Sequence, residues 1–403
     1  WGRGSRAAWG PWQRITGSAS EGKDTIGRGL TASTKEPAIF APVDKPPSII
    51  SVKLESGLLS LRVHRSLLPW DSLLGFASRE NPRRGFLLVS KILGRHLPVR
   101  PHILQEAAEL LASSLEQGLP SPVLFVALAE TATLLGALIH ESCQKGKGKD
   151  LGFLQTTRYQ VGEVALCSSE PHSHAPFHYL HFPEDEETRR IFLTAKTLVL
   201  IDDEITSGTT LQNLSQAYRK LNPGLLEERW MALSNFMPSR GKEPMALLHG
   251  KMDFVADPRF APCPANPLPP LSRVIGFVDP GRRGYRFPPC HRPLSFFPDQ
   301  RVLVLGTGEF AYLPFQVARS WEAAGAEVYF QAISRSPIRV GGAIHCRIVL
   351  DDPYGQGVPH YLYNVKEGMY DHIVVLAEPG ASPALPEALL AHVEEVPCGS
   401  WLS

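Results

Sequence analysis

The sequence predicts an α/β protein made of two successive units, each with a parallel sheet flanked by helices. Short apolar runs alternate with segments of helical period, and this alternation stops and restarts across a stretch dense in proline and glycine. With 403 residues the chain is long enough for two or three domains. We expect a disordered segment at 1–40, domains at 41–240 and 299–403, and a Pro/Gly-rich connection at 241–298.

The first unit begins with a strand pair and continues as alternating strands and helices. The pattern IISVKLESGLLSLRV predicts two strands around a Glu-Ser-Gly turn. Each later apolar run precedes a segment of helical spacing, as parallel strands with helical crossovers require. The predicted strands lie at 49–63 (the pair), 122–129, 197–204 and 229–237, and the predicted helices at 133–143 and 209–221.

The second unit has the same alternation, which predicts a Rossmann-like α/β domain. A strand over 301–310 is followed by a helix to about residue 324, and further strands are expected at 326–333 and 371–379. The turn Gly306-Thr307-Gly308 lets backbone approach a ligand, but a single Gly-x-Gly only weakly indicates a dinucleotide.

Charge and cysteine content narrow the class of protein. The chain has 41 basic and 40 acidic residues, which argues against a nucleic-acid binder with a basic surface. Its six cysteines form no Cys-x-x-Cys pair, so neither a zinc site of that type nor a disulfide framework is expected. The apolar stretch 122–139 carries Glu130 at its centre, where a bilayer would penalise it. We expect no membrane span and a cytoplasmic protein that acts on small molecules.

The segment from Leu198 to Thr210 predicts a sugar-phosphate site. Four apolar residues end at two aspartates, and a run of small residues then opens a helix. Such a loop presents unpaired N–H groups to a phosphate, and carboxylates at the strand end can accept from ribose hydroxyls. The alternative is an ordinary strand–turn–helix that happens to carry two aspartates. The expected contacts are Asp202, Asp203, Glu204, Thr206, Ser207, Gly208, Thr209 and Thr210.

This segment resembles the 5-phosphoribosyl 1-pyrophosphate (PRPP) signature of the type I phosphoribosyltransferases over all thirteen positions. The resemblance implies that family's fold, a parallel sheet flanked by helices. It also implies that Asp202 and Asp203 hold the ribose 2- and 3-hydroxyls, and that Asp202 stabilises an oxocarbenium-like state. Mg²⁺ would be the cofactor, carried mainly by substrate oxygens with no protein metal cage.

Two further segments fit the family. Glu130, Thr131 and Thr133 lie between a predicted strand and a predicted helix, where the family has a short pyrophosphate-binding loop; a plain turn is the alternative. The region from TTRY to PHSHAPFHYLH corresponds to the family's mobile loop over the pyrophosphate, with Arg158 as its cation and His174 as a phosphate or base contact. A zinc site and a solvated loop are alternatives for the histidines.

A basic segment upstream has two readings. Its cations are positioned to serve the nucleobase or an acidic acceptor, but a solvated helix face is at least as compatible with the pattern. Its members are Arg83, Arg84, Lys91 and Arg95.

The second unit resembles a C-terminal domain named TRSP after a Thr-Arg-Ser-Pro signature, which occurs joined to a phosphoribosyltransferase domain. The resemblance rests on Ser334-Arg335-Ser336-Pro337 and on residues 351–365, with Ser334 in place of the threonine. Three segments of the first unit also resemble this two-domain family, namely GFASRENPRRG, AETATLLG and TTR, so the resemblance covers about residues 40–395. It points to an orotate phosphoribosyltransferase-like group associated with bacterial tellurite-resistance gene clusters. The second-domain candidates for anion binding are Gly306, Thr307, Gly308, Arg335 and Ser336.

The resemblance implies an enzyme that joins ribose 5-phosphate to a base, or removes it, in synthesis or salvage of a nucleoside-like metabolite. Its substrates would be PRPP and an unidentified base, and a homodimer is one possible assembly. Two other functions stay open: a non-catalytic sensor of PRPP or a nucleotide, and a phosphorolytic enzyme acting on a preformed nucleotide.

Overall fold

The computed structural model describes most of the chain after residue 48. The described residues belong to a compact unit formed by residues 40–403. The predicted disordered segment at 1–40 lies outside them. They are 49–81, 84–116, 118–145, 150–169, 177–238, 243–262, 280–284, 299–378, 381–390 and 393–397.

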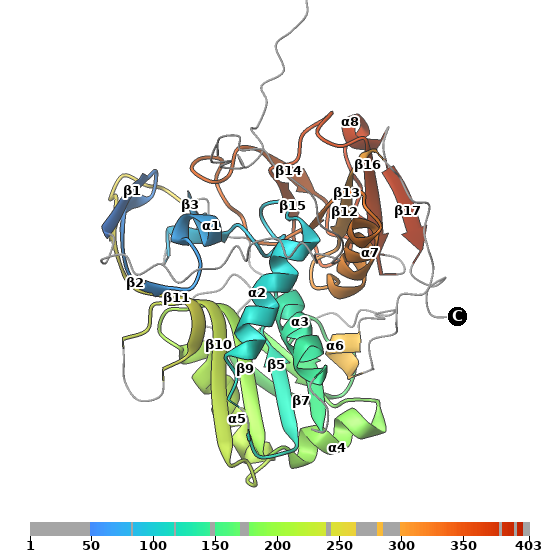
Figure 1. The fold of residues 1–403 in the computed structure, drawn as a ribbon. Coiled ribbons are helices and arrows are strands. Elements are labelled where there is room, and N and C mark those ends of the chain that lie inside the picture. The colour runs from blue at the N-terminus through green and yellow to red at the C-terminus, as the bar shows by residue number, and fades with distance from the viewer. Residues whose placement is uncertain are drawn as a thin grey trace, which may run out of the picture. The chain divides into compact units, whose positions relative to one another are not determined.

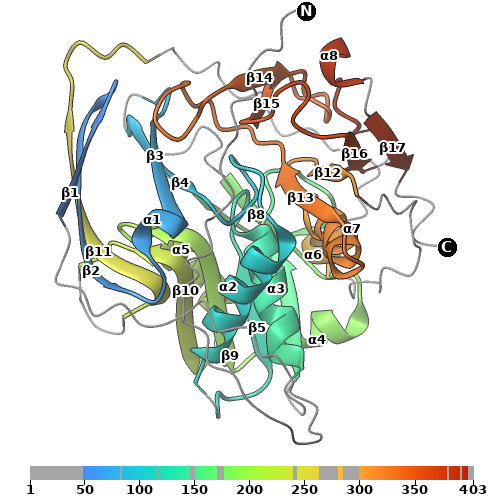
Figure 2. The ribbon, with the colours of Figure 1, turned by 45° about the horizontal axis from the view of Figure 1, so that its top comes forward.

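The larger sheet has seven strands (Figure 1). Five of them, β6, β5, β9, β10 and β11, run parallel to one another, and β2 and β1 are added at the β11 edge by antiparallel pairing. The parallel sheet predicted for the first unit is therefore confirmed. Figure 2 shows β1, β2 and β11 side by side at one end of the sheet. The order is β1 (Ile49–Leu54), β2 (Gly57–Ser66), β11 (Met245–Ala256), β10 (Glu227–Asn235), β9 (Thr197–Ile205), β5 (Val123–Ala127) and β6 (Leu151–Gln155).

Helices cover both faces of this sheet. Successive strand residues point to opposite faces, so the apolar runs of β5 and β9 supply two cores. Phe125 and Ile201 pack in the cluster that contains α2 and α3, whereas Leu124 and Leu200 pack with α4 and α5. Such two-sided burial is why these strands read as continuous apolar runs. The helices are α2 (Pro101–Ser113), α3 (Thr133–Gln144), α4 (Glu186–Thr194) and α5 (Thr209–Leu221).

Two antiparallel hairpins flank the carboxyl ends of the parallel strands. The first, β3 (Leu74–Ser78) with β4 (Phe86–Ser90), follows the short helix α1 (Trp70–Leu73). The second pairs β7 (Val164–Ser169) with β8 (Phe177–His181). A bridge between Thr157 and Tyr179 holds β8 beside the segment that follows β6, and a bridge between Arg79 and Ile338 joins the end of β3 to the second domain.

The second domain contains a four-stranded sheet in which all strands are parallel. Helix α7 (Tyr312–Ala323) packs on one face of it, against β12 and β13. The Rossmann-like label for this domain stays a prediction. The strand order is β13 (Glu327–Ala332), β12 (Arg301–Gly306), β16 (His372–Ala377) and β17 (Val393–Pro397). The domain also has the hairpin β14 (Arg347–Leu350) and β15 (His360–Tyr363) and the short helix α8 (Glu387–Leu390), whereas the short helix α6 (Pro280–Arg283) contacts β6 and β8 of the first domain.

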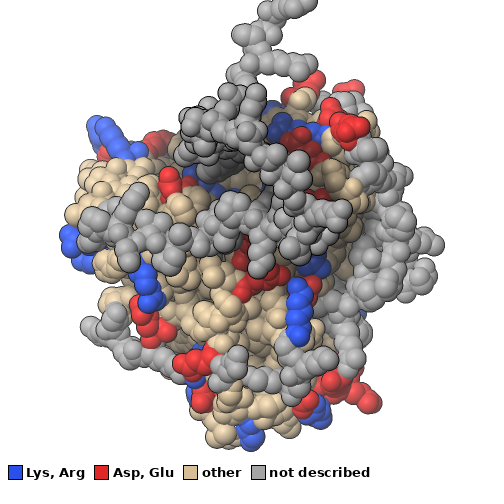
Figure 3. All heavy atoms as spheres, viewed as in Figure 1, with Lys and Arg blue, Asp and Glu red and all other residues tan. Residues whose placement is uncertain are grey.

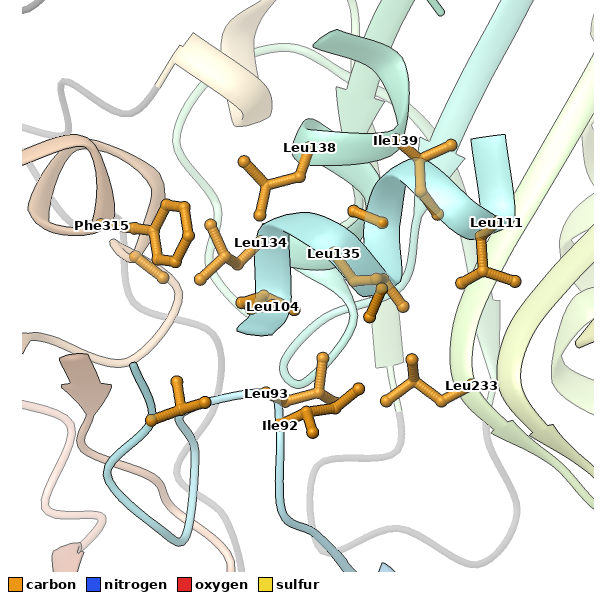
Figure 4. Close-up of a cluster of buried hydrophobic side chains, with 14 of the residues drawn as sticks. Ile92, Leu93, Leu104, Leu111, Leu134, Leu135, Leu138, Ile139, Leu233 and Phe315 are labelled. Carbon is orange, nitrogen blue, oxygen red and sulfur yellow. The ribbon is translucent and has the colours of Figure 1, made fainter. Parts of the chain in front are cut away.

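One apolar cluster runs through both domains. Figure 4 shows Phe315 of α7 pointing toward Leu134 of α3, with Leu104 of α2 close by. Each of these three side chains is at most 3% exposed, and replacing such a phenylalanine by alanine costs about 3–5 kcal/mol. The second domain is therefore packed against the first through a shared core.

Strand β11 corrects one expectation. The prolines and glycines of residues 241–298 predicted an irregular connection, but residues 245–256 form a twelve-residue strand of the larger sheet. No proline lies between Pro244 and Pro258, so the chain can still donate to neighbouring strands there. The proline-dense part begins only at Pro258.

Surface charge and helix length are two features that differ between proteins that bind nucleic acid or membranes and proteins that do not. Figure 3 shows basic and acidic side chains interspersed on the described part of one face, in keeping with a formal net charge of +1. Among the described residues, none of the helices is long and apolar enough to cross a bilayer.

Candidate functional site

The loop after β9 leads from the middle of the larger sheet into α5. Gly208 has a φ of +73°, in the left-handed region. A Cβ there would lie 2.7 Å from Cζ3 of Trp230 and 3.0 Å from Sδ of Met237, so both conformation and space require glycine. Helix α5 begins directly afterwards, and its first N–H groups have no acceptor within the helix. The hydroxyls of Ser207 and Thr209 lie 2.9 Å apart at the same place, so the loop gathers hydrogen-bond donors suited to a phosphate.

Three consecutive carboxylates stand at the end of β9. Burial, together with the charge of Glu204, raises the pKa of Asp203. The guanidinium of Arg84 pairs with Glu204 and lies 4.6 Å from the centre of the Phe86 ring. Burial is the larger of these two causes, and both disfavour the charged carboxylate, which hydroxyl donors or a cation would stabilise.

The turn between β5 and α3 is held by Arg95, which is 2% exposed. Its Nη2 donates to the carbonyl of Glu130 at 2.7 Å. Its Nη1 donates to the carbonyls of Gly308 at 2.5 Å and Ile333 at 3.0 Å. A single buried cation therefore joins the turn of the first domain to two backbone carbonyls of the second.

The Glu130 carboxylate lies between cations of both domains. Its Oε1 is 3.7 Å from Nη1 of Arg95, and its Oε2 accepts from the backbone N–H of Arg335 at 3.4 Å. Burial raises its pKa, but Arg95 and Arg335 outweigh burial and the net shift is downward. Glu130 is therefore ionised at neutral pH. An anion bound at this turn needs cations to offset the charge of Glu130.

The Thr-Thr-Arg segment follows β6 and forms hydrogen bonds to the turn between β5 and α3. Oγ1 of Thr156 accepts from the backbone N–H of Ala129 at 2.8 Å. Nη2 of Arg158 donates to the carbonyl of Ala129, and its Nη1 donates to that of Phe177, both at 3.0 Å. Arg158 lies between the carboxyl end of β6 and the β7–β8 hairpin, and these hydrogen bonds join it to the turn after β5 and to β8.

Glu309 of the second domain contacts the Thr-Thr-Arg segment, although no sequence pattern predicted a role for it. It is 1% exposed, and its Oε1 accepts from the backbone N–H of Arg158 at 2.8 Å. Its Oε2 accepts from the Thr157 hydroxyl at 2.5 Å and from Nε of Arg282 at 2.9 Å. Arg282 also donates to Glu378 at 2.7 Å. A carboxylate directly after the Gly-Thr-Gly turn was visible in the sequence, but no pattern showed which segment it would bind.

A cavity of about 190 Å³ lies where these segments meet. Its walls come from the loop after β9, the turn after β5, the β3–β4 hairpin and the Ser334–Ser336 segment of the second domain. The expected site residues that line it are Asp202, Asp203, Glu204, Thr206, Ser207, Gly208, Thr209, Thr210, Glu130, Thr131, Arg158, Arg335 and Ser336.

Other expected residues do not line this cavity. Thr133 is the first residue of α3, and its hydroxyl donates to the carbonyl of Glu130 at 3.3 Å. The hydroxyl of Tyr354 donates to the carbonyl of Thr307 at 3.1 Å, so the Gly-x-Gly turn is engaged in contacts within the protein. His174 lies outside the described residues. The expected residues absent from the lining are Thr133, Gly306, Thr307 and Gly308.

The described histidines of the histidine-rich segment are buried. His178 and His181 are each 1% exposed, and Nδ1 of His178 lies 2.9 Å from Oγ1 of Thr156. Burial lowers the pKa of His181 to about 4. In the described ranges, no group of three or more His, Cys, Asp or Glu residues is arranged to hold a metal ion. Of these two histidines, His178 also lines the cavity.

Arg79 and His96 also line the cavity, although the sequence analysis did not select them. Burial and the neighbouring arginines lower the pKa of His96 to about 3, so its ring is neutral. Neither ring nitrogen has a hydrogen-bond partner among the described residues. Of the basic segment, Arg84 reaches the cavity, Lys91 donates to a surface carbonyl, and Arg83 lies outside the described residues.

Mg²⁺ fits the carboxylate end of β9. The ion prefers oxygen ligands and commonly keeps substrate phosphates and water in its coordination shell. Asp202, Asp203 and Glu204 place carboxylate oxygens at this end of β9, and the charge of Glu204 adds to burial in raising the pKa of Asp203. Asp202 and Asp203 are the side chains that would face an ion carried mainly by substrate oxygens.

Comparison with protein families gives two matches that together cover most of the described residues. Residues 73–258 match a family described as phosphoribosyl transferase. Residues 291–393 match the TRSP domain, described as lying C-terminal to that family. A comparison with curated proteins gives no match.

Solved structures similar to the chain include three such transferases. Adenine phosphoribosyl transferase from Trypanosoma brucei shares 16% identity at a TM-score of 0.26, covering 34% of this chain and 53% of that one. Hypoxanthine-guanine phosphoribosyltransferase from Bacillus anthracis shares 13% sequence identity at a TM-score of 0.27, and the match covers 39% of this chain and 84% of that one. Adenine phosphoribosyltransferase from Thermoanaerobacter pseudethanolicus shares 17% sequence identity at a TM-score of 0.27, and the match covers 37% of this chain and 81% of that one. The chain thus spans about half the length of the first.

Proposed function

Because the chain belongs to the phosphoribosyl transferase family and carries its C-terminal TRSP domain, we propose that it uses PRPP and Mg²⁺ to join ribose 5-phosphate to a base. The observation that carries this proposal is the single cavity lined by the loop after β9, the turn after β5 and Arg158. In the reaction, a ring nitrogen of the base bonds to C1 of the ribose while the C1–O bond to pyrophosphate breaks. The nitrogen loses its proton and pyrophosphate leaves.

The 5-phosphate is assigned to residues 206–210. Backbone N–H groups at the start of α5 and the hydroxyls of Ser207 and Thr209 supply the donors, and the helix dipole adds attraction for an anion. Gly208 keeps the loop tight against Trp230. Basic side chains are unnecessary at this position because N–H donors carry the recognition.

The ribose hydroxyls are assigned to Asp202 and Asp203. Carboxylates at the end of a buried strand are pre-positioned acceptors, and their charge favours the oxocarbenium-like state as the C1–O bond breaks. Mg²⁺ bound with PRPP would offset the repulsion between these carboxylates and the substrate's phosphates. The pKa of Asp203, raised by burial and then by the charge of Glu204, supports this because a cation would oppose both effects.

The pyrophosphate is assigned to the turn after β5 and to Arg158. Thr131 in that turn and the Arg158 guanidinium line the same cavity. The hydrogen bond from Arg158 to the carbonyl of Ala129 keeps the cation next to the turn. The base would then occupy the part of the cavity near Arg79 and His96, and its identity would decide which nucleoside-like metabolite is made or salvaged.

Pyrophosphate release across a panel of purine, pyrimidine and other heterocyclic bases tests the proposal. Turnover that depends on Mg²⁺ and falls at least about 100-fold in Asp202→Asn with Asp203→Asn would support it, in line with lost electrostatic stabilisation. PRPP binding without turnover on any base would favour the alternative of a non-catalytic sensor. Turnover of a preformed nucleotide with phosphate, and none with pyrophosphate, would favour a phosphorolytic enzyme.

A further inference from the structure

Arg335 differs from the other arginines around the cavity in how its guanidinium is used. Arg84 pairs with Glu204, and Arg158 donates to two backbone carbonyls. Among the described residues, the Arg335 guanidinium takes part in no hydrogen bond or ion pair, and its carbon lies 4.8 Å from the centre of the Tyr159 ring. Stacking on an aromatic face orients the guanidinium, while its N–H donors stay available for a ligand.

The position of Arg335 relates it to the pyrophosphate end of the cavity. Its backbone N–H donates to Oε2 of Glu130, in the turn after β5. Arg335, Thr131 and Arg158 all line the cavity. The ionised Glu130 would repel a diphosphate at this turn, so a cation from outside the turn is required. The deeper Arg95 is already engaged with three carbonyls.

We propose that Arg335 of the C-terminal domain binds the pyrophosphate group of PRPP and of the pyrophosphate product. This rests on the function proposed above and extends it, because it makes the second domain part of the substrate site. A guanidinium presents paired N–H donors that match phosphate oxygens. The Ser336 hydroxyl next to it is buried, lines the cavity and has no partner among the described residues, so it provides a second donor.

Calorimetric titration of the full chain tests this assignment. Pyrophosphate, PRPP and ribose 5-phosphate, each with Mg²⁺, are titrated into the wild type, Arg335→Gln and Arg335→Lys. We expect Arg335→Gln to weaken pyrophosphate and PRPP binding by about 10- to 100-fold, as for loss of a charge-assisted hydrogen bond, and to leave ribose 5-phosphate binding unchanged. Arg335→Lys should recover part of the loss, because it keeps the charge without the paired donors.

The matched control is Arg301→Gln. Arg301 belongs to the same domain and its guanidinium lies 5.2 Å from the centre of the Tyr329 ring. It does not line the cavity, and it is the first residue of β12, at the other end of that strand from Gly306. It should bind all three ligands like the wild type. Thermal unfolding verifies that each variant is folded.

Two results would overturn the assignment of Arg335. One is unchanged pyrophosphate affinity in folded Arg335→Gln; the other is an equal loss of affinity for all three ligands. Failure of the proposed function would look different, because the wild type itself would then bind neither ribose 5-phosphate nor PRPP.

Discussion

Oε1 of Glu309 lies 2.8 Å from the backbone nitrogen of Arg158, so a carboxylate of the second domain holds the segment of the first domain that carries the proposed pyrophosphate-binding arginine. The same carboxylate accepts from the Thr157 hydroxyl and from Arg282. Neither Glu309 nor Arg282 is more than 1% exposed. The geometry around Arg158 therefore depends on the docking of the two domains.

Replacing Glu309 by glutamine should destabilise the protein by about 3 kcal/mol, because removing one member of a buried ion pair leaves its partner with uncompensated charge. This loss is at the low end of the range of about 3–5 kcal/mol for breaking a buried ion pair, because Arg282 still pairs with Glu378. Urea unfolding measures the change. Glu327→Gln removes the exposed partner of Arg301 and should cost about 1 kcal/mol or less. Equal effects of the two substitutions would contradict the buried-pair interpretation.

Thr157→Val tests the positioning role without disturbing the ion pair. It removes the 2.5 Å hydrogen bond to Glu309, and we expect a net loss of about 0.5–1.5 kcal/mol in stability. Steady-state kinetics should show a lower kcat for pyrophosphate release, and Thr157→Ser should restore it because the hydroxyl returns. If the serine variant is as impaired as the valine variant, the hydroxyl is not what positions Arg158.

The parallel sheet of the first domain could be predicted because its strands are buried on both faces. Residues 198–201, for example, are all apolar, and the helix at 209–221 was predicted with the bounds observed for α5. Strand β11 was missed because prolines before and after it resembled a linker. The β3–β4 hairpin was missed because each of its strands has only five residues and a polar, basic segment separates them.

The loop after β9 could be located from sequence because all its members are consecutive. The participation of His96, Arg79 and Glu309 could not, since each reaches the site only through tertiary packing. Glu309 illustrates the reason: it binds Thr157 and Arg158, about 150 positions earlier in the chain. A spacing pattern cannot show which of several buried acids meets which basic segment.

Gly208→Ala should disrupt the loop after β9. The left-handed conformation alone costs about 1–2 kcal/mol for a residue with a Cβ, and here the new atom would also lie 2.7 Å from the Trp230 ring. Binding of ribose 5-phosphate, measured by calorimetry, should be lost or strongly weakened. Gly355→Ala is the control: its φ of +71° is similar, but nothing lies within 4 Å of the added atom. Normal sugar-phosphate binding by the Gly208 variant would argue against the loop as the phosphate site.

Asp203→Asn should stabilise the protein at neutral pH while weakening PRPP binding. Burial and Glu204 raise the pKa of Asp203 in the folded state, so its contribution to stability is present at low pH and is lost as pH rises through that pKa. The asparagine variant avoids this loss. Its melting temperature at pH 8 should exceed that of the wild type by about 2–4 °C per kcal/mol recovered, and the difference should shrink in acid. A variant less stable than the wild type at pH 8 would contradict the sign of the shift.

The contact between His102 of α2 and Glu322 of α7 should make stability pH-dependent. The hydrogen bond to Glu322, at 2.8 Å, raises the pKa of His102 despite partial burial. The stabilisation is therefore complete below the unfolded pKa of about 6.5 and is lost as pH rises through the folded pKa. Because His102 is 48% exposed, the effect should stay below about 1 kcal/mol.

Urea unfolding of the wild type and His102→Gln at several pH values between 5.5 and 8.5, roughly the range in which histidine titrates, checks this. The difference in unfolding free energy should be largest at the acidic end and vanish at the basic end. A constant difference would show that His102 contributes through packing rather than charge.

Direct binding of PRPP in the presence of Mg²⁺ tests the central claim most closely. Calorimetry on the wild type should give saturable binding that ribose 5-phosphate competes for, and Asp202→Asn with Asp203→Asn should weaken that binding while the protein stays folded. Failure of the wild type to bind PRPP, or equal affinity in the double variant, would contradict the assignment of the cavity as a phosphoribosyl transferase site.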